Sequence, residues 1–150
     1  MAFLLNLMQK IYNYYRIPTL FETSGQPSER ELKSLAQNGY DVVINLASKS
    51  ILNGKIINEK NILRSLQLTY IHIPVDFANP TERDFKKFVF NIQKYFDKKK
   101  FIHCQANFRV SAFCYKYRKD ILKQEHEKII KDLNAIWFPN KTWKSFLNIP

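Results

Sequence analysis

The chain has 150 residues, of which 45% are hydrophobic and 25% charged, a mix typical of one globular domain. Twelve Phe, eight Tyr and two Trp can fill a substantial core, which excludes wholesale disorder, and two Cys exclude a secreted-type disulfide framework. Lys and Arg outnumber Asp and Glu by 24 to 13, a formal charge of +11, so the chain attracts anions such as phosphorylated substrates, acidic membranes or nucleic acid.

The N-terminal segment, residues 1–16, has apolar residues at helical spacing and predicts a helix that docks on the domain. Its apolar run is too short to cross a bilayer and has no signal-peptide pattern, so we expect a cytoplasmic protein with no transmembrane segment. Residues 16–23 predict an extended edge segment, and residues 24–27 predict a turn.

A capped helix and a buried strand come next. Ser28 opens a capping box that satisfies the first amides of a helix, and Gly39 suits the left-handed position that ends it. Residues 41–47 form a continuous apolar run, which predicts a strand buried on both faces. A loop over 48–55 and a helix over 58–66 follow.

Strands and helices continue to alternate through the second half of the chain. The next predicted elements are a strand over 68–75, a long amphipathic helix over 81–100 and a short strand over 101–103. Three helices follow, over 109–122, 125–137 and 141–147. This alternation predicts an α/β fold with a mostly parallel central sheet of about four to five strands flanked by helices. We expect one domain over 1–150, with 124–150 as a helical tail.

The stretch from His103 to Ser111 places a cysteine where a strand ends, before a short loop and an arginine that opens a helix. In an open parallel sheet the ligand crevice lies at the carboxyl ends of the strands. Amides of a tight loop and a helix N-terminus bind an anion there and favour the thiolate form of Cys104. Arg109 can hold two phosphate oxygens in a fork geometry. A lone cysteine is more often a buried structural thiol. The anion-binding interpretation therefore rests on the whole pattern of strand, cysteine, loop and arginine, and not on Cys104 alone.

This stretch resembles the signature loop of the cysteine-dependent protein tyrosine and dual-specificity phosphatases, which place His-Cys before a phosphate cradle and Arg then Ser or Thr after it. Small bacterial phosphatase-like proteins share three further pieces, which here are Ser24–Pro27, Val42–Leu46 and Ile73–Val75. The resemblance covers residues 17–120 and implies a protein-tyrosine-phosphatase-like fold.

The loop departs from the standard phosphatase loop in length and composition. Four residues rather than five separate Cys104 from Arg109, as in the small bacterial group, and the usual glycine is missing. Asn107 can take the place of that glycine, because Asn tolerates the left-handed region. The same spacing also resembles rhodanese-like sulfurtransferases, which use a Cys persulfide. A non-catalytic phosphate-binding module is the third function that the sequence leaves open.

The resemblance implies a phosphatase that hydrolyses phosphomonoesters, of the protein tyrosine or dual-specificity type. Cys104 then attacks phosphorus to form a phosphocysteine intermediate, while the loop amides and the arginine hold the oxygens. The predicted substrate-binding residues are the loop and its arginine: Gln105, Ala106, Asn107, Phe108 and Arg109.

A general acid must protonate the leaving oxygen, and Asp76 is the candidate. It lies on the loop after the preceding strand, 28 residues before Cys104, as the family's acid loop does; a loop-capping Asp is the alternative. Asp84 better fits helix capping, and Glu82 is a further candidate. Ser111 is predicted to donate to the sulfur and help it leave, and a back-bonded helix serine is the alternative.

The remaining chemically active side chains predict supporting roles. His103 is expected to orient the loop from beneath, and Cys114 fits core packing better than a redox role. His72 and His126 lack neighbours at ligand spacing, and no nucleotide loop occurs, so neither a metal nor a cofactor is expected. The aromatic residues have core spacing, so the expected partner is a phosphorylated protein or another acidic phosphate substrate rather than nucleic acid.

Overall fold

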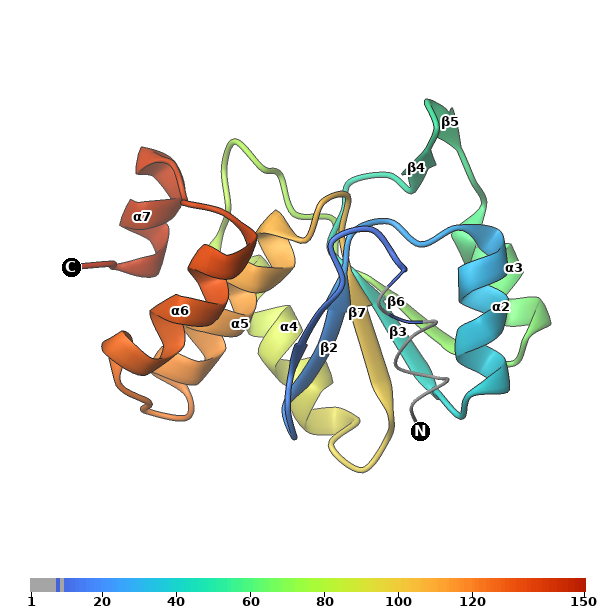
Figure 1. The fold of residues 1–150 in the computed structure, drawn as a ribbon, viewed down its shortest axis with the longest axis horizontal. Helices are drawn as coiled ribbons and strands as arrows, with labels where there is room; N and C mark the ends of the chain where they lie inside the picture. Colours follow the sequence, from blue (N-terminus) through green and yellow to red (C-terminus); the bar gives the residue numbers. More distant parts are fainter. Residues whose placement is uncertain (1–7, 9) are drawn as a thin grey trace.

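A five-stranded sheet forms the centre of the protein in a computed structural model that describes residue 8 and residues 10–150 (Figure 1). The strands, in their order across the sheet, are β1 (Tyr15–Ile17), β2 (Phe21–Ser24), β7 (Lys100–His103), β3 (Val42–Asn45) and β6 (Thr69–His72). The β1–β2 pair is antiparallel, and the other three neighbouring pairs are parallel. The predicted α/β fold with a mostly parallel central sheet is therefore confirmed.

Helices cover both faces of this sheet (Figure 1). They are α2 (Glu29–Gln37), α3 (Glu59–Ser65), α4 (Glu82–Lys94), α5 (Phe108–Asp120), α6 (His126–Ile136) and α7 (Lys141–Leu147). Helices α2 and α3 pack on one face, where Val43 and Phe101 are buried with their leucines. Helices α4, α5, α6 and α7 contribute to the core on the other face, where Ile44 and Ile102 are buried. This alternation explains why the central strands read as continuous apolar runs.

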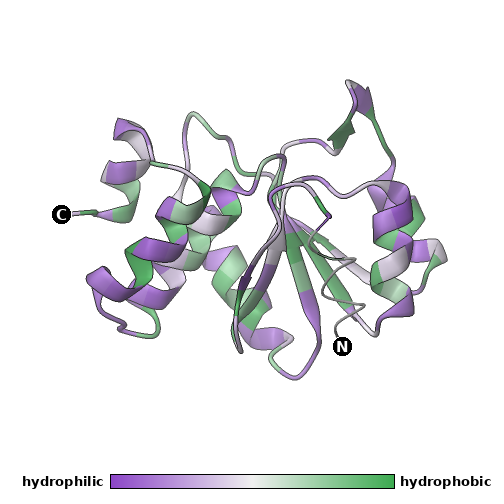
Figure 2. Cartoon of the chain, in the orientation of Figure 1, coloured by the Kyte–Doolittle hydropathy of each residue, from purple (hydrophilic) through white to green (hydrophobic). Residues whose placement is uncertain are grey.

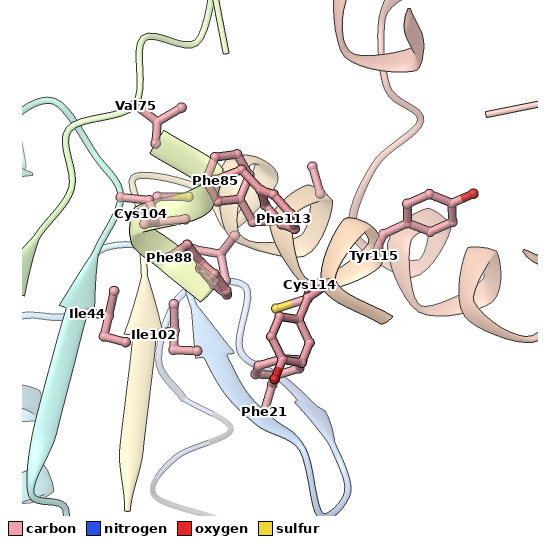
Figure 3. Close-up of a cluster of buried hydrophobic side chains, with 14 of the residues drawn as sticks. Phe21, Ile44, Val75, Phe85, Phe88, Ile102, Cys104, Phe113, Cys114 and Tyr115 are labelled. Carbon is pink, nitrogen blue, oxygen red and sulfur yellow. The ribbon is translucent and has the colours of Figure 1, made fainter. Parts of the chain in front are cut away.

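Apolar residues follow the central strands, whereas the helices carry both apolar and polar residues (Figure 2). The larger core cluster brings Phe21, Phe88 and Phe113 together beside Ile44 and Ile102 (Figure 3). The rings of Phe88 and Phe113 meet edge to face, with centroids 5.6 Å apart. Within the residues that the structure describes, no helix is long and apolar enough to cross a membrane.

The local signals for α2 are confirmed. The Ser28 hydroxyl accepts from the Glu31 N–H at 3.1 Å, and the Glu31 carboxylate accepts from the Ser28 N–H at 2.8 Å, which completes the capping box. Gly39 has a φ of +82°, so it takes the left-handed position that ends the helix.

Several predicted segments differ from the structure. The long helix predicted over 81–100 ends at Lys94, and Lys100 already belongs to β7. The predicted loop 48–55 contains most of a small hairpin, β4 (Ile51–Leu52) and β5 (Lys55–Ile56). Asn53 and Gly54 turn it with φ angles of 51° and 76°, the left-handed pair that a tight hairpin turn needs. Half of the predicted N-terminal helix over 1–16 falls on residues outside those described, and its last residues were assigned wrongly. They enter β1 because pairing with β2 overrides the helical spacing.

Candidate active site

The carboxyl ends of the parallel strands form one edge of the sheet, and polar residues collect along it. Ser24 on β2 and Asn45 on β3 lie in register with His103 at the end of β7. Cys104 follows directly, so the parallel register places it on the edge where open sheets bind ligands.

Cys104 is fully buried at the base of the loop that joins β7 to α5. Its N–H donates to the Ser24 carbonyl at 3.4 Å, which continues the pairing of β2 and β7 into the loop. The side chain lies below Val75 and beside Phe85 (Figure 3). An anion reaches the sulfur only when part of this cover moves, because the residue has no surface open to solvent.

Asn107 takes the left-handed conformation, with a φ of 67° and a ψ of 7°, immediately before α5 begins. This confirms the position predicted for it in place of glycine. Its amide nitrogen donates to the Asn13 carbonyl at 2.9 Å and to the Thr23 hydroxyl at 3.0 Å. These two bonds fix the loop to the segment around β1 and β2, which a glycine could not do.

The carbonyls and the amides of the loop differ in their partners. The Gln105 carbonyl accepts from the Gln26 N–H at 3.0 Å, and the Ala106 carbonyl accepts from the Asn13 amide at 3.0 Å. By contrast, the N–H groups of residues 105–109 donate no hydrogen bond to any residue that the structure describes. Successive N–H groups in a left-handed turn that enters a helix form an anion-binding nest.

Gly25 lets the turn at 24–27 approach this loop. A Cβ atom at this position would lie 2.8 Å from the Gln105 carbonyl oxygen and 2.7 Å from a ring carbon of Tyr12. The first of these neighbours is backbone that is already held by Gln26, so it cannot move aside cheaply. The Ser-Gly-Gln-Pro turn therefore shapes the outer side of the loop.

Arg109, the first-turn residue of α5, reaches the segment that follows β6. Its Nη1 donates to the Val75 carbonyl at 2.9 Å, and its guanidinium carbon lies 6.0 Å from the centroid of the Phe77 ring. Asp76 lies between these two residues, so the structure brings the arginine and the segment of the predicted acid together.

Asp76 itself is exposed, and its carboxylate accepts from the Ala78 N–H at 2.9 Å. This is the loop-capping geometry that the sequence left as an alternative, and its role as general acid stays a prediction. Asp84 donates its N–H to the Thr81 hydroxyl at 3.2 Å in the first turn of α4, as expected for a capping position. Glu82 instead pairs with Lys116 at 3.0 Å, which holds α4 against α5.

Ser111 lies one helical turn beyond the loop. Its hydroxyl donates to the Phe108 carbonyl at 3.0 Å and accepts from the indole N–H of Trp137 at 3.1 Å. No hydrogen bond joins it to Cys104 in this geometry, which matches the back-bonded alternative. Donation to the sulfur would require this hydroxyl to leave Phe108, and that role stays a prediction.

A buried carboxylate that the sequence analysis missed lies beneath the loop. Glu59, in the first turn of α3, has a carboxylate oxygen 2.8 Å from Nε2 of His103. The other ring nitrogen of His103 lies 3.2 Å from the Cys104 carbonyl oxygen. Asn45 and Ser50 donate to the second Glu59 oxygen at 3.0 and 2.9 Å. His103 thus lies between the backbone of the loop and a carboxylate 44 residues away in sequence, and its role in orienting the loop stays a prediction.

The ionisation of Glu59 follows from this environment. Burial opposes the charged form, but the charge and hydrogen bond of His103, with hydrogen bonds from Ser50 and Gln26, outweigh it and lower the pKa of Glu59. An acidic residue at the start of a helix normally predicts only capping and dipole effects, so the sequence carried no signal for a buried role.

Aromatic rings flank the opposite side of the loop. The ring of Phe108 stacks on Trp137 with centroids 4.6 Å apart and planes 1° from parallel. Phe77 packs against both of these rings and against Trp143 of α7, at 5.6 to 6.4 Å. The two C-terminal helices, predicted only as a tail, therefore build one wall of the site.

Other groups that could carry chemistry are placed elsewhere. Cys114 is buried in the core, where burial raises its pKa well above the ordinary value of a thiol. His72 bonds to the Ala47 carbonyl, and His126 bonds to the Tyr115 hydroxyl. Among residue 8 and residues 10–150, no three His, Cys, Asp or Glu side chains gather as metal ligands would.

The sheet, the loop after β7 and the arginine of α5 define a protein of the cysteine-dependent protein tyrosine and dual-specificity phosphatase superfamily. Residues 15–142 match the family model described as DSP-PTPase phosphatase fused to NAD+ kinase. The chain therefore belongs to this phosphatase family.

Solved structures carry the same fold. A provisionally assigned phosphatase (DUF442) from Shewanella putrefaciens CN-32 is 29% identical, with a TM-score of 0.80 over 96% of this chain and 94% of that one. The core catalytic domain of the PP-IP phosphatase SIW14 from S. cerevisiae has a TM-score of 0.74 at 13% identity, over 93% and 85% of the two chains. TpbA from P. aeruginosa has a TM-score of 0.71 at 12% identity, over 91% and 84%. No curated protein matches the chain significantly.

Proposed function

We propose that this protein hydrolyses phosphomonoesters through a phosphocysteine intermediate on Cys104. The observation that carries the proposal is the loop of residues 105–109, whose N–H groups have no acceptor among the described residues while Arg109 stands at its end. Buried or half-buried amides need partners, and the oxygens of a phosphate supply several at once.

The reaction divides into two balanced steps. The Cys104 thiolate attacks phosphorus, the bond to the ester oxygen breaks, and Asp76 gives its proton to the departing oxygen. Asp76, now a carboxylate, takes a proton from water as that water attacks phosphorus. The phosphorus–sulfur bond then breaks, inorganic phosphate leaves, and the thiolate and the protonated carboxyl are restored. No metal or cofactor takes part in either step.

Arg109 has to change partners when the substrate binds. Its Nη1 holds the Val75 carbonyl, and Val75 lies over the buried Cys104 (Figure 3). A phosphate dianion is a stronger acceptor than a neutral carbonyl, so it can displace Val75 from the guanidinium. The exchange both binds the phosphate and removes part of the cover from the sulfur.

The charge and the cysteines support a substrate class and a compartment. The formal charge of +11 favours acidic substrates, such as proteins phosphorylated on tyrosine, serine or threonine, or other acidic phosphates. The nucleophile must stay reduced, and Cys104 and Cys114 are both free, which fits the cytoplasm.

Turnover of an aryl phosphate by the purified protein tests this proposal. We expect hydrolysis by the wild type, loss of all of it in Cys104→Ser, and a loss of about 10²-fold in Asp76→Asn because the general acid is gone. Arg109→Lys should also be strongly impaired, since an ammonium group cannot form the bidentate fork. Circular dichroism would establish that each variant is folded.

The two other functions predict different results. A sulfurtransferase would transfer sulfur from thiosulfate to cyanide and carry a persulfide on Cys104, and Asp76→Asn would leave that transfer intact. A binding module would retain phosphopeptide binding in Cys104→Ser with no turnover by the wild type. Either result would contradict the phosphatase proposal.

A further inference from the structure

The loop that carries Asp76 is tied down on both sides of this residue. On one side the Val75 carbonyl accepts from Arg109 at 2.9 Å. On the other side the Phe77 carbonyl accepts from the indole N–H of Trp143 at 2.8 Å. The second tie reaches from α7, 66 residues further along the chain, and no part of the reaction described above uses it.

The two ties differ in how easily they can be exchanged. Arg109 is half-buried and has further N–H donors, so water or an anion can take the place of Val75 at little cost. Trp143 is fully buried and has a single N–H donor. Releasing Phe77 would leave that buried donor without a partner, which is unfavourable. Substrate binding therefore breaks the first tie more readily than the second.

Packing reinforces the tie made by Trp143. Its ring lies 5.8 Å from Phe77, 6.1 Å from Phe113 of α5 and 5.7 Å from Phe146 of its own helix. The Asn140 side chain accepts the backbone N–H of Trp143 at 3.0 Å and caps the start of α7. The indole is thus fixed by the core on one side and by its helix on the other, and it presents a rigid donor to the acid loop.

We propose that Trp143 is a positioning residue that holds the Phe77 carbonyl and thereby keeps Asp76 in place for proton transfer when Arg109 releases Val75 to bind phosphate. This inference rests on the proposed phosphatase function. The loop that carries Asp76 then does not move as a whole. The Val75 carbonyl loses its hydrogen bond to Arg109 when the substrate binds, while the Phe77 carbonyl keeps its hydrogen bond to Trp143.

Two esters that differ in their need for an acid separate this role from a purely structural one. Phenyl phosphate has a poor leaving group and needs protonation, whereas 2,4-dinitrophenyl phosphate departs without it. We expect Trp143→Phe to lower kcat/KM for phenyl phosphate about tenfold, a fraction of the full general-acid effect, and for the dinitrophenyl ester less than about twofold, because kcat/KM reports only the steps up to formation of the phosphocysteine. In the Asp76→Asn background, Trp143→Phe should cause no further loss with phenyl phosphate, because the acid it positions is absent.

Phe146→Leu is the matched control, since it loosens the packing of α7 around Trp143 without removing a hydrogen bond to the loop. It should change kcat/KM for both esters by the same small factor. If Trp143→Phe does not fold, benzothienylalanine can be incorporated at position 143 instead. This residue keeps the shape of the indole ring but has sulfur in place of the N–H group, so the same comparison of the two esters applies to it.

The possible results are distinct. Equal losses on both esters in Trp143→Phe, or losses that multiply with those of Asp76→Asn, would overturn the positioning role and leave the phosphatase function intact. A wild-type protein that hydrolyses neither ester would overturn the proposed function, and this inference with it.

Discussion

The two sides of the loop at residues 104–109 are held by different forces. On the side of α2 and α3, the buried pair of His103 and Glu59 supports the loop through charge and hydrogen bonds. On the side of α6 and α7, Phe108 stacks on Trp137 within a cluster of rings. The stability that a buried ion pair contributes depends on pH, and removing one partner destabilises the protein strongly because the other is left buried and unpaired. The stability that ring packing contributes does not depend on pH, and the loss of one ring contact costs less.

This difference suggests a division of labour across the site. The charged side fixes the start of the loop, next to Cys104, where small displacements would misplace the proposed nucleophile. The aromatic side fixes the end of the loop and the segment around Phe77 that carries the proposed acid, where phosphate binding as proposed exchanges one contact. Four predictions test this contrast, and the largest effect is expected on the charged side.

Glu59→Gln should destabilise the protein by about 3–5 kcal/mol, because it leaves His103 buried without its charged partner. Urea unfolding followed by fluorescence measures this loss. The matched control is Glu29→Gln, which removes a pair with Lys33 whose side chains are 58% and 55% exposed, and it should cost less than about 1 kcal/mol. Equal losses in the two variants would contradict a buried ionic support.

The stability that Glu59 contributes should also depend on pH. Its pKa is lowered from an ordinary value of 4.5 in the folded state, so its contribution is complete above that value and is lost as the pH falls through the folded-state pKa. The gap in unfolding free energy between wild type and Glu59→Gln should therefore narrow as the pH is lowered from about 6, where the carboxylate is charged in both states, to below its ordinary pKa of 4.5. A gap that stays constant over this range would show that the carboxylate has no charge-dependent role.

Phe108→Leu tests the aromatic side and should cost about 1 kcal/mol, the value of the lost stacking on Trp137. Unlike the effect of Glu59→Gln, this loss should be the same at both ends of that pH range. Phe96→Leu is the control, because Phe96 is 81% exposed and should lose almost nothing. A pH-dependent loss in Phe108→Leu would remove the distinction between the two sides.

An equally small effect concerns the left-handed residue between the two sides. Asn107→Ala and Asn107→Gly both remove the hydrogen bonds to Asn13 and Thr23. Only Ala has a Cβ atom, which makes the backbone conformation at a φ of 67° unfavourable. Asn107→Ala should therefore be less stable than Asn107→Gly by about 1 kcal/mol in thermal or urea unfolding. If the two variants are equally stable, the loop does not hold the left-handed turn on which the nest of amides depends.

Local sequence signals predicted much of this fold. The capping box at Ser28, the apolar run of β3 and the left-handed position of Asn107 all act over a few residues, so spacing and residue type were enough. The end of the predicted N-terminal helix was wrong because strand pairing with Phe21–Ser24 decides the conformation of Tyr15–Ile17. That pairing is a tertiary effect, and helical spacing does not reveal it.

The loop at the centre of the candidate site could be predicted from the sequence, but the distant residues that hold the loop and its neighbours in place could not. The His-Cys to Arg pattern lies within seven residues and marks the loop from His103 to Arg109. The supports come from far along the chain: Glu59 meets His103 across 44 residues, and Trp143 meets Phe77 across 66. Nothing in the sequence near these two residues distinguishes them from a helix-start acid and a core tryptophan.

The most direct test of the central claim is a mass spectrum of the acid-quenched reaction of Asp76→Asn with 2,4-dinitrophenyl phosphate. This ester forms the intermediate without an acid, and the variant lacks the base that hydrolyses it, so the adduct should accumulate. We predict one added phosphoryl group, located by peptide mapping on Cys104 and absent from the Cys104→Ser variant. Turnover of the ester with no phosphoryl group on Cys104, or an adduct on another residue, would contradict the account.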